Sequence, residues 1–253
     1  MIHFVGAGSG ATDLITVRGA RLLAEADVII YAGSLVNKEL LHGARPECAL
    51  HDSAYLTLEE VIAIMAQAER DGKTTVRLHT GDPSIYGAIR EQMDALAQRG
   101  IEYDVVPGVS SMCGAAAALK AEYTLPDVSQ TVIVTRMAGR TPVPEREQIR
   151  ALAQSGSTMV IFLSTGLLPE LTRELLLGAY TEHTPAAIVY KATWPDERVF
   201  RCTVGTLAET AKKHNITKTA LITVGDFLGQ TYERSKLYDP GFSTEFRRQS
   251  DER

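Results

Sequence analysis

Short apolar runs alternate with amphipathic helical patterns along almost the whole chain, and this alternation constrains the fold more than any other feature. Strands that alternate with helices predict parallel sheets whose faces are covered by those helices. We expect strands at residues 2–5, 28–31, 75–78, 103–106, 131–135, 159–163, 186–190 and 220–224. We expect helices near residues 17–25, 58–71, 84–98, 111–120, 144–154, 169–177 and 206–214. The run at residues 198–204 has no helix before it, so it is expected to pair antiparallel with residues 186–190.

The chain of 253 residues is long enough for two domains with cores of their own. A proline turn at residues 123–127 (YTLPD) follows an alanine-rich helical pattern and marks the expected boundary. We therefore predict an α/β fold of two domains, residues 1–122 and 123–253, each built on a mainly parallel sheet. The last stretch, from about residue 230, is polar with scattered aromatic residues and is expected to be a partly ordered tail.

Charge, hydropathy and cysteine content narrow the class of protein. The net charge of −5 argues against general nucleic-acid binding, although a local basic patch could still bind an anionic ligand. No window approaches the roughly 18 apolar residues of a membrane span, and the N-terminus shows no secretory signal. Cys48, Cys113 and Cys202 are far apart and odd in number, which indicates structural roles in a reducing compartment. We expect a cytoplasmic protein that binds no metal, membrane or nucleic acid.

The segment HTGDPSIYG at residues 79–87 stands at the end of an expected buried strand. At the carboxyl end of a parallel strand, such a segment places bare backbone and one carboxylate where α/β proteins bind ligands. Gly81 lets the backbone approach a ligand closely, and Pro83 suits the first position of a following helix. The segment fits either a ligand-binding loop or a turn that only starts a helix.

The glycine-rich segment GAGSGA at residues 6–11 formally fits the G-x-G-x-x-G/A fingerprint of dinucleotide-binding folds. Two features argue against NAD(P). Residues 12–16 separate the segment from the next helix, and the second expected strand ends without an acidic residue for a ribose hydroxyl. We expect the segment to border a ligand, with a tight strand-to-helix connection as the alternative.

Other strand ends also carry unusual residues, and their coincidence is more informative than any single motif. Residues 106–111 (VPGVSS) begin a helix with free amides and two hydroxyls. A long loop at residues 135–144 holds Arg136 and Arg140, and the loop at residues 190–197 holds Lys191 and the only tryptophan, Trp194. Because arginine offers a bidentate fork to carboxylates, these cations could bind a polyanionic ligand. Alternatively, the three cations are solvated charges on surface loops, and Trp194 packs in a core.

Four segments together resemble the tetrapyrrole methylases, the S-adenosylmethionine-dependent class III methyltransferases of cobalamin and sirohaem synthesis. They are GAGSG with DLIT within residues 6–16, YAGSLV at 31–36, HTGDPSIYG at 79–87 and PGVSS at 107–111. The resemblance runs in order from about residue 2 to residue 229. Residues 130–145 and 189–197, with tail residues 237–242 and 246–248, narrow it to one branch of the family.

The resemblance implies two α/β domains with a deep cleft between them, a homodimer, and S-adenosyl-L-methionine folded in the cleft with S-adenosyl-L-homocysteine as product. Most contacts to this methyl donor would come from the backbone. By position, the implied donor-binding residues are Ser9, Thr80, Gly81, Asp82, Ile85, Ser110, Ser111, Leu163, Ala192, Ala220 and Leu221. The substrate would be a tetrapyrrole rich in carboxylates, and Arg136, Arg140 and Lys191 would hold those carboxylates.

The chain departs from the family pattern at two places. Ser9 stands where many relatives have proline, so its contact to the donor would come from the backbone or from van der Waals packing. Residues 32–34 (AGS) lack the aspartate that many uroporphyrinogen methylases carry just after the equivalent of Tyr31, so no catalytic base is assigned.

Three alternatives stay open at this point. An NAD(P) oxidoreductase is suggested by the glycine-rich segment alone. A methylase of the same fold could act on RNA or a protein side chain, although the acidic charge and the second-half segments disfavour it. A non-catalytic partner domain is disfavoured by the density of strand-end motifs. Whether the tetrapyrrole already holds cobalt is also open, since a metal would arrive with the substrate.

Overall fold

The computed structural model describes residues 1–33 and 35–248, so Ser34 of the YAGSLV segment and the last five tail residues lie outside the described residues. The chain divides into two compact units. The first contains Met1–Ala115 and Lys191–Glu197, and the second contains Ala116–Tyr190 and Arg198–Arg253. The predicted boundary at residues 122/123 thus lies inside the second unit. A pattern read along the chain could not show that residues 191–197 pack with the first unit.

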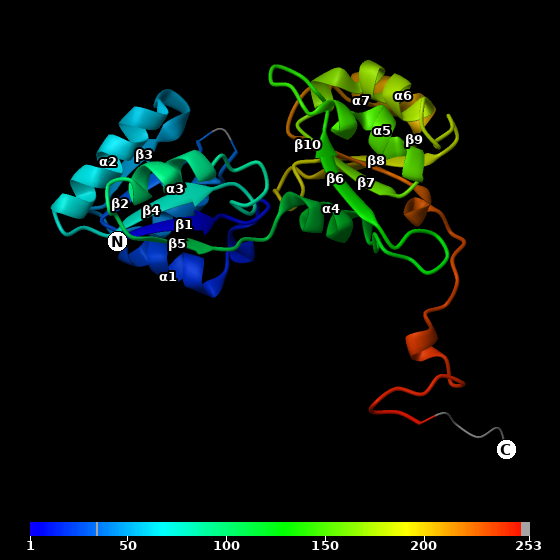
Figure 1. Ribbon diagram of the computed structural model, residues 1–253, viewed down its shortest axis with the longest axis horizontal. Coiled ribbons are helices and arrows are strands. Elements are labelled where there is room, and N and C mark those ends of the chain that lie inside the picture. The colour runs from blue at the N-terminus through cyan, green and yellow to red at the C-terminus, as the bar shows by residue number, and fades with distance from the viewer. Residues whose placement is uncertain (34, 249–253) are drawn as a thin grey trace. The chain divides into compact units, whose positions relative to one another are not determined.

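The first unit is built on a five-stranded, fully parallel sheet with strand order β3-β2-β4-β1-β5 (Figure 1). The strands are β1 (Ile2–Gly6), β2 (Val28–Tyr31), β3 (Ala49–Asp52), β4 (Thr75–His79) and β5 (Tyr103–Val106). The helices are α1 (Val17–Glu25), α2 (Leu58–Arg70), α3 (Arg90–Ala97) and α4 (Ser111–Leu119), the last of which continues into the second unit.

Alternating side chains of this sheet form two separate cores. Val28 and Ile30 of β2 pack with α2 and α3 on one face, whereas Ile29 packs with α1 on the other (Figure 1). Both faces of a parallel sheet are therefore covered, as the continuous apolar runs of the sequence predict. The α2 helix begins at a capping box, in which Thr57 and Glu60 each bond the backbone of the other.

The second unit is built on a mixed sheet with strand order β6-β7-β10-β8-β9. Only β6 and β7 pair in parallel, and the other three pairings are antiparallel. The strands are β6 (Val132–Arg136), β7 (Thr158–Phe162), β8 (Pro185–Tyr190), β9 (Arg198–Thr203) and β10 (Ala220–Val224). The helices are α5 (Ile149–Leu152), α6 (Leu168–Leu176) and α7 (Leu207–Lys213).

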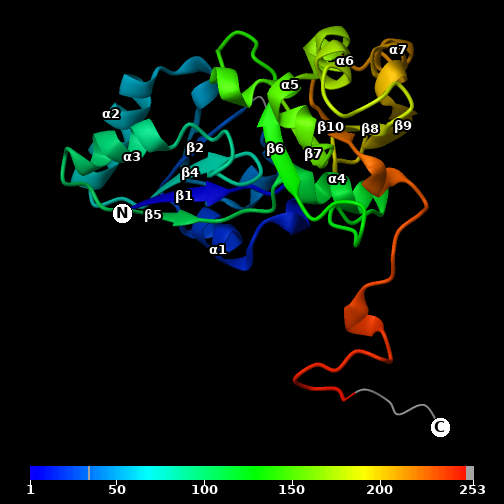
Figure 2. The same ribbon diagram turned by 45° about the vertical axis from the view of Figure 1, so that its right-hand side comes forward.

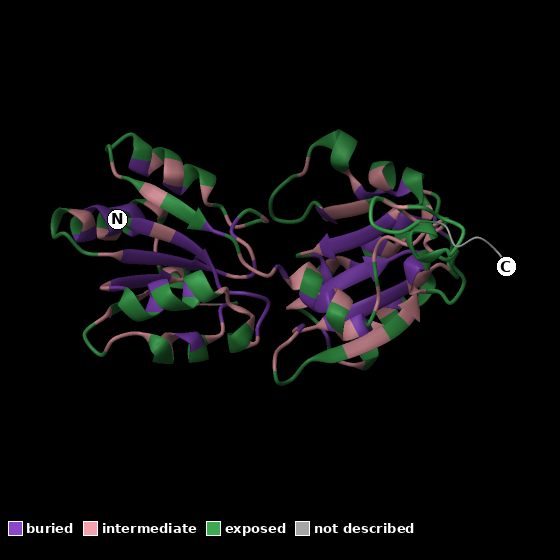
Figure 3. Cartoon of the chain, turned by 90° about the horizontal axis from the view of Figure 1, so that it is seen from below, coloured by how far each residue is buried: buried purple, intermediate pink, exposed green. Residues whose placement is uncertain are grey.

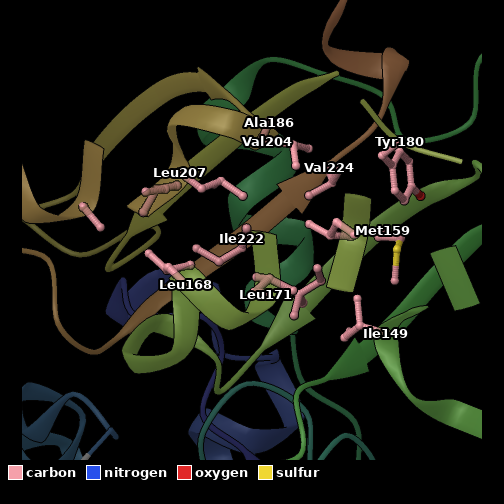
Figure 4. Packing of buried hydrophobic residues seen from close by; sticks show 14 of the residues in the cluster. Ile149, Met159, Leu168, Leu171, Tyr180, Ala186, Val204, Leu207, Ile222 and Val224 are labelled. Atoms are coloured by element: carbon pink, nitrogen blue, oxygen red, sulfur yellow. The ribbon is translucent and has the colours of Figure 1, made fainter. Parts of the chain in front are cut away.

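The core of the second unit lies between this sheet and α5, α6 and α7 (Figures 2 and 4). Leu171 from α6 and Met159 and Ile222 from neighbouring strands are fully buried there. Burial of each such side chain contributes about 1.5–3 kcal/mol relative to exposure. In both units the buried residues follow the strands, while the outer helix faces are exposed (Figure 3).

The predicted α/β class, the expected strands and the antiparallel pairing of β9 with β8 are confirmed. The mainly parallel sheet predicted for the second domain is instead mixed, because β10 lies antiparallel between β7 and β8. The predicted helix at residues 84–98 is wrong at its start, since α3 begins only at Arg90. Residues 83–86 form a turn instead, and Tyr86 and Ala88 have left-handed φ angles of 56° and 50°, which no α-helix can contain. Pro83 therefore fixes a turn and does not begin a helix.

The edge strand β3 was not expected, because its four residues are partly exposed and lack an apolar run. The tail beyond residue 229 contains one short 3-10 turn, Lys236–Tyr238, and is largely exposed as far as it is described. Across residues 1–33 and 35–248, no helix combines the length and apolar character needed to cross a bilayer.

Candidate functional site

Three glycines bring the loops after β1, β4 and β5 into direct backbone contact. All three strands are parallel, so these loops leave the same edge of the first sheet. A Cβ atom added to Gly108 would lie 2.1 Å from the Gly81 carbonyl oxygen and 2.7 Å from the Gly6 Cα atom. Real Cβ contacts are never that short, so these loops can pack together only without side chains. The result is an edge of bare backbone.

The loop after β1 is joined to the loop after β4 by a short backbone bridge. Gly81 N donates to Gly8 O at 2.9 Å, and Ala7 N donates to His79 O at 2.7 Å. Gly8 and Gly81 have φ angles of 81° and 61°, a left-handed conformation in which glycine is not strained. The glycine-rich segment is thus an extension of the sheet edge. Helix α1 begins only at Val17, which fits the expectation that the segment does not open a dinucleotide-binding helix.

Asp82 fastens the loop after β4 to the loop after β5. Its Oδ2 atom accepts a hydrogen bond from Gly108 N at 2.8 Å, and its Oδ1 atom accepts from Ser84 N at 2.8 Å and from the Ser84 hydroxyl. Burial raises the pKa of the Asp82 carboxyl, but these hydrogen bonds outweigh burial and hold the pKa below its ordinary value. The carboxylate is therefore charged at neutral pH and holds the site together.

The two residues that precede Gly81 in the sequence each carry a buried polar atom with no hydrogen-bond partner among the described residues. These atoms are Thr80 Oγ1 and His79 Nε2. Burial lowers the pKa of His79 to about 3, and the nearby charge of Arg77 acts in the same direction. Buried polar atoms are normally paired, so orphaned ones at a strand end fit a place where a polar ligand or water supplies the partner. The donor-binding prediction includes Thr80 but not His79.

Ser9, Ser110 and Ser111 line the same region of the first unit. Ser9 and Ser110 are buried, and the Ser110 hydroxyl accepts weakly from Met112 N at 3.4 Å, in the first turn of α4. Ile85 lies in the turn after Asp82 and is partly exposed.

A residue that the sequence did not single out, Thr193, contacts the glycine-rich segment directly. Its Oγ1 atom lies 2.9 Å from Ser9 Oγ and accepts a hydrogen bond from Ala11 N at 3.1 Å. Beside it, Trp194 covers Gly10, where an added Cβ would lie 2.1 Å from the indole Cδ1 atom. Ala192, a predicted donor-binding residue, is buried in the same loop. The first unit therefore holds eight predicted donor-binding residues on its loops: Ser9, Thr80, Gly81, Asp82, Ile85, Ser110, Ser111 and Ala192.

The remaining predicted donor-binding residues, Leu163, Ala220 and Leu221, lie where β7 ends and β10 begins, at two inner strands of the second sheet. The antiparallel register of β10 and β7 pairs Ile222 with Ile161, so Ala220 falls opposite Leu163. Leu163 is 64% exposed and has a left-handed φ angle of 51°. An exposed leucine in a strained backbone conformation is uncommon, and such residues gather at ligand sites. Leu221 is buried next along β10.

The three predicted substrate-binding cations differ in what they contact. Arg136 donates to the carbonyl oxygens of Met137, Thr141 and Pro142, so its guanidinium organises its own loop. Arg140 is exposed in the middle of that loop. Lys191, in the first unit, is paired with Asp196 at 2.7 Å.

The part of the chain that the structure describes holds no group of three or more His, Cys, Asp or Glu side chains arranged to bind a metal ion. The glycine edge and the orphaned Thr80 hydroxyl instead fit an organic ligand that is bound by backbone and small side chains.

Comparison with known proteins gives one family. The model of the Tetrapyrrole (Corrin/Porphyrin) Methylases matches residues 1–208. The cobalt-precorrin-4 C(11)-methyltransferase of Methanocaldococcus jannaschii is 53% identical over 248 residues, which cover 98% of this chain and 96% of the relative. The precorrin-4 C(11)-methyltransferase of Mycobacterium tuberculosis is 44% identical over 239 residues, which cover 94% of this chain and 95% of the relative.

Comparison with solved structures also gives methyltransferases that act on tetrapyrroles. A cobalt precorrin-4 methyltransferase matches with a TM-score of 0.89 at 45% identity, covering 90% of this chain and 96% of that structure. The uroporphyrin-III C-methyltransferase of Thermus thermophilus, complexed with S-adenosyl homocysteine, matches with a TM-score of 0.73 at 25% identity, covering 90% of this chain and 93% of that structure.

Proposed function

The chain belongs to the tetrapyrrole methylase family, and from that premise we propose that it methylates carbon 11 of a precorrin-4-type tetrapyrrole with S-adenosyl-L-methionine. Relatives named for this reaction are 44–53% identical over nearly the whole chain, which supports the proposal. The single structural observation that carries it is the bare edge formed by Gly6, Gly81 and Gly108, beside the orphaned hydroxyl of Thr80.

We propose that the loops of the first unit hold the donor. Gly81 and Ser9 offer backbone, Thr80 and Ser111 offer hydroxyls, and Asp82 fixes the two loops that carry them. Ile85, Ser110 and Ala192 complete the set in this unit. Leu163, Ala220 and Leu221 are the proposed contributors of the second unit.

When bound, the sulfonium donor supplies an electrophilic methyl group. The chain then needs mainly to orient the donor and the nucleophilic carbon, and orientation can lower a barrier by roughly 7–11 kcal/mol. The hydrogen bonds of Asp82 and Thr193 suit that task, because they keep the loops rigid before any ligand arrives. No side chain is assigned as the base.

We propose that Arg140 is the principal contact for substrate carboxylates, with Lys191 and Arg136 in support. Arg140 is exposed, whereas Arg136 is engaged by three carbonyl oxygens and Lys191 by Asp196. An arriving carboxylate would compete with Asp196 for Lys191. From the family resemblance we further propose a homodimer that works in the cytoplasm, which sedimentation of the purified protein and fractionation of its host would test.

The substrate can be metal-free precorrin-4 or its cobalt-bearing counterpart. Two cobalt-precorrin-4 enzymes are 53% and 45% identical to this chain and a precorrin-4 enzyme is 44% identical, so only the first of the three relatives favours the cobalt-bearing substrate. Turnover of both substrates, followed by mass spectrometry for the gain of one methyl group, decides between them.

The first test is calorimetric binding of S-adenosylhomocysteine to wild type, Asp82→Ala and the matched control Asp94→Ala, an exposed carboxylate paired with Arg90. We expect binding by wild type and the control, and weakened binding by Asp82→Ala. Failure of the folded wild-type protein to bind would overturn the proposal, and binding of NADH in its place would favour an oxidoreductase.

A further inference from the structure

The loop Lys191–Glu197 acts on the glycine-rich segment although, in sequence, it connects β8 and β9 of the second unit. We propose that Thr193 is a positioning residue for the methyl-donor site, which it serves by fixing the backbone of residues 9–11. This inference rests on the proposed function, because it concerns the same donor. We refer to Lys191–Glu197 as the strap.

Thr193 meets the glycine-rich segment through one hydroxyl with two partners. Its Oγ1 atom accepts from Ala11 N at 3.1 Å and lies 2.9 Å from Ser9 Oγ. The Thr193 methyl group faces α4, where an added Cβ at Gly114 would lie 3.0 Å from it. One side chain therefore holds both ends of the Ser9–Ala11 stretch and packs against the helix that starts at the β5 loop. Asn37 fixes Gly10, the middle residue of this stretch, since its Nδ2 atom donates to Gly10 O at 2.8 Å.

The strap keeps Thr193 in an unfavourable backbone conformation. Its φ angle is 67°, in the left-handed region that β-branched residues avoid. Glu197 offsets this strain, because its Oε2 atom accepts from Thr193 N at 2.6 Å. Two backbone bonds close the strap on itself, from Trp194 N to Lys191 O and from Glu197 N to Trp194 O, both at 3.0 Å. Glycine would relieve the strain but would lose the hydroxyl.

Trp194 also packs against the glycine-rich segment. Its indole covers Gly10, where no side chain could fit, and the Lys191 ammonium lies 5.5 Å from the centre of its ring. The glycine-rich segment is thus fixed from the strap by a hydrogen bond at Ala11 and by packing at Gly10. Since Ser9 Oγ is engaged by Thr193, Ser9 is left to meet the donor through its backbone.

The experiment compares Thr193→Val, which keeps the shape and removes the hydroxyl, with Thr193→Ser, which keeps the hydroxyl. We expect Thr193→Val to weaken S-adenosylhomocysteine binding about tenfold, equivalent to 1.4 kcal/mol. Thr193→Ser should bind within about twofold of wild type. The control Thr203→Val removes a hydroxyl from the capping pair with Thr206 in the second unit and should leave the affinity unchanged. The Michaelis constant for the donor should rise more than the turnover number falls.

Amide hydrogen exchange of the ligand-free protein tests the strap independently of the donor. The Ala11 amide should exchange faster in Thr193→Val than in wild type, and at the wild-type rate in Thr203→Val. If Thr193→Val does not fold, Glu197→Gln offers a milder loosening of the strap, with the same direction of change expected.

Unchanged exchange and unchanged affinity in Thr193→Val would overturn the inference, and so would equal weakening by Thr193→Ser. Absence of binding by wild type, with accelerated Ala11 exchange in Thr193→Val, would instead overturn the proposed function and leave the strap in place.

Discussion

The Oδ2 atom of Asp82 accepts a 2.8 Å hydrogen bond from the amide of Gly108, and this bond joins two loops that are 26 residues apart in sequence. The same carboxylate accepts from the Ser84 amide, so it fixes the turn that follows it as well. A single negative charge satisfies these amides, and the stability of the site therefore depends on that charge.

Asp82→Asn should destabilise the protein at neutral pH and reduce its sensitivity to acid. The folded-state pKa of Asp82 lies below its ordinary value, so its stabilisation is present above about pH 4 and is lost as the pH falls further. The loss at pH 7 should be about 1–2 kcal/mol, toward the lower end for hydrogen bonds to charged groups, because solvent screens this partly exposed site. Urea unfolding of both proteins at pH 7 and pH 3.5 measures this. If the free energies of unfolding of wild type and Asp82→Asn differ by the same amount at both pH values, the prediction is contradicted.

Gly108→Ala should be strongly destabilising, because the new Cβ would lie 2.1 Å from the Gly81 carbonyl oxygen. The loops would have to separate, at a cost of about 1–3 kcal/mol or more. Gly43→Ala is the matched control, since no described heavy atom lies within 4 Å of its added Cβ. The control should be neutral or slightly stabilising. Thermal unfolding of the two variants measures the difference, and similar midpoints would show that the loops are not in tight contact.

His79 should make the protein less stable as the pH falls from about 6.5 toward 4. The unfolded chain binds a proton at this histidine below its ordinary pKa, whereas the folded chain keeps it neutral down to about pH 3. The free energy of unfolding should therefore fall by up to about 1.4 kcal/mol per pH unit in this window.

His79→Gln should flatten this slope, whatever its effect on stability at pH 7. His183→Gln, at an exposed position, is the control for the loss of a histidine. Urea unfolding between pH 4 and pH 7 measures both slopes. A wild-type slope in His79→Gln would mean that another group controls the acid sensitivity.

Arg140→Gln should weaken binding of the tetrapyrrole about tenfold and leave S-adenosylhomocysteine binding unchanged, as loss of one charge-assisted contact implies. Arg136→Gln should instead loosen its loop, because its guanidinium bonds three carbonyl oxygens there. Arg150→Gln, at an exposed position of α5, is the control. Michaelis constants for the tetrapyrrole compare the three. Equal values for Arg140→Gln and Arg150→Gln would remove Arg140 from the substrate site.

Strand ends could be predicted from the sequence because the pattern that marks a strand and the pattern that marks the following loop are both local. Apolar runs give the strands, and the glycines, prolines and hydroxyls that follow give the loops. Residues 6–11, 79–87 and 107–111 do lie together at one sheet edge, as parallel strands require.

The remaining features depend on contacts between distant residues or on single backbone angles. Thr193 bonds Ala11 across 182 residues, and no local pattern in either segment indicates that the two residues pair. Helix α3 begins at Arg90 and not at residue 84, because Ala88 has a left-handed φ angle. Nothing in the sequence distinguishes this alanine from one inside a helix. Arg136 was expected to face a substrate, and only the structure shows that the carbonyl groups of its own loop engage it.

The strap has a consequence for the order in which the protein can be made. Met1–Ala115 is synthesised before Lys191–Glu197. The first unit therefore begins to emerge from the ribosome while the strap, which belongs to it, has not yet been made. Until then Gly10 lacks its indole cover and the Ala11 amide lacks its acceptor. In the N-terminal half made alone, the glycine-rich segment would therefore lack both contacts. The proposed methyl-donor site would be completed only after most of the second sheet has been synthesised.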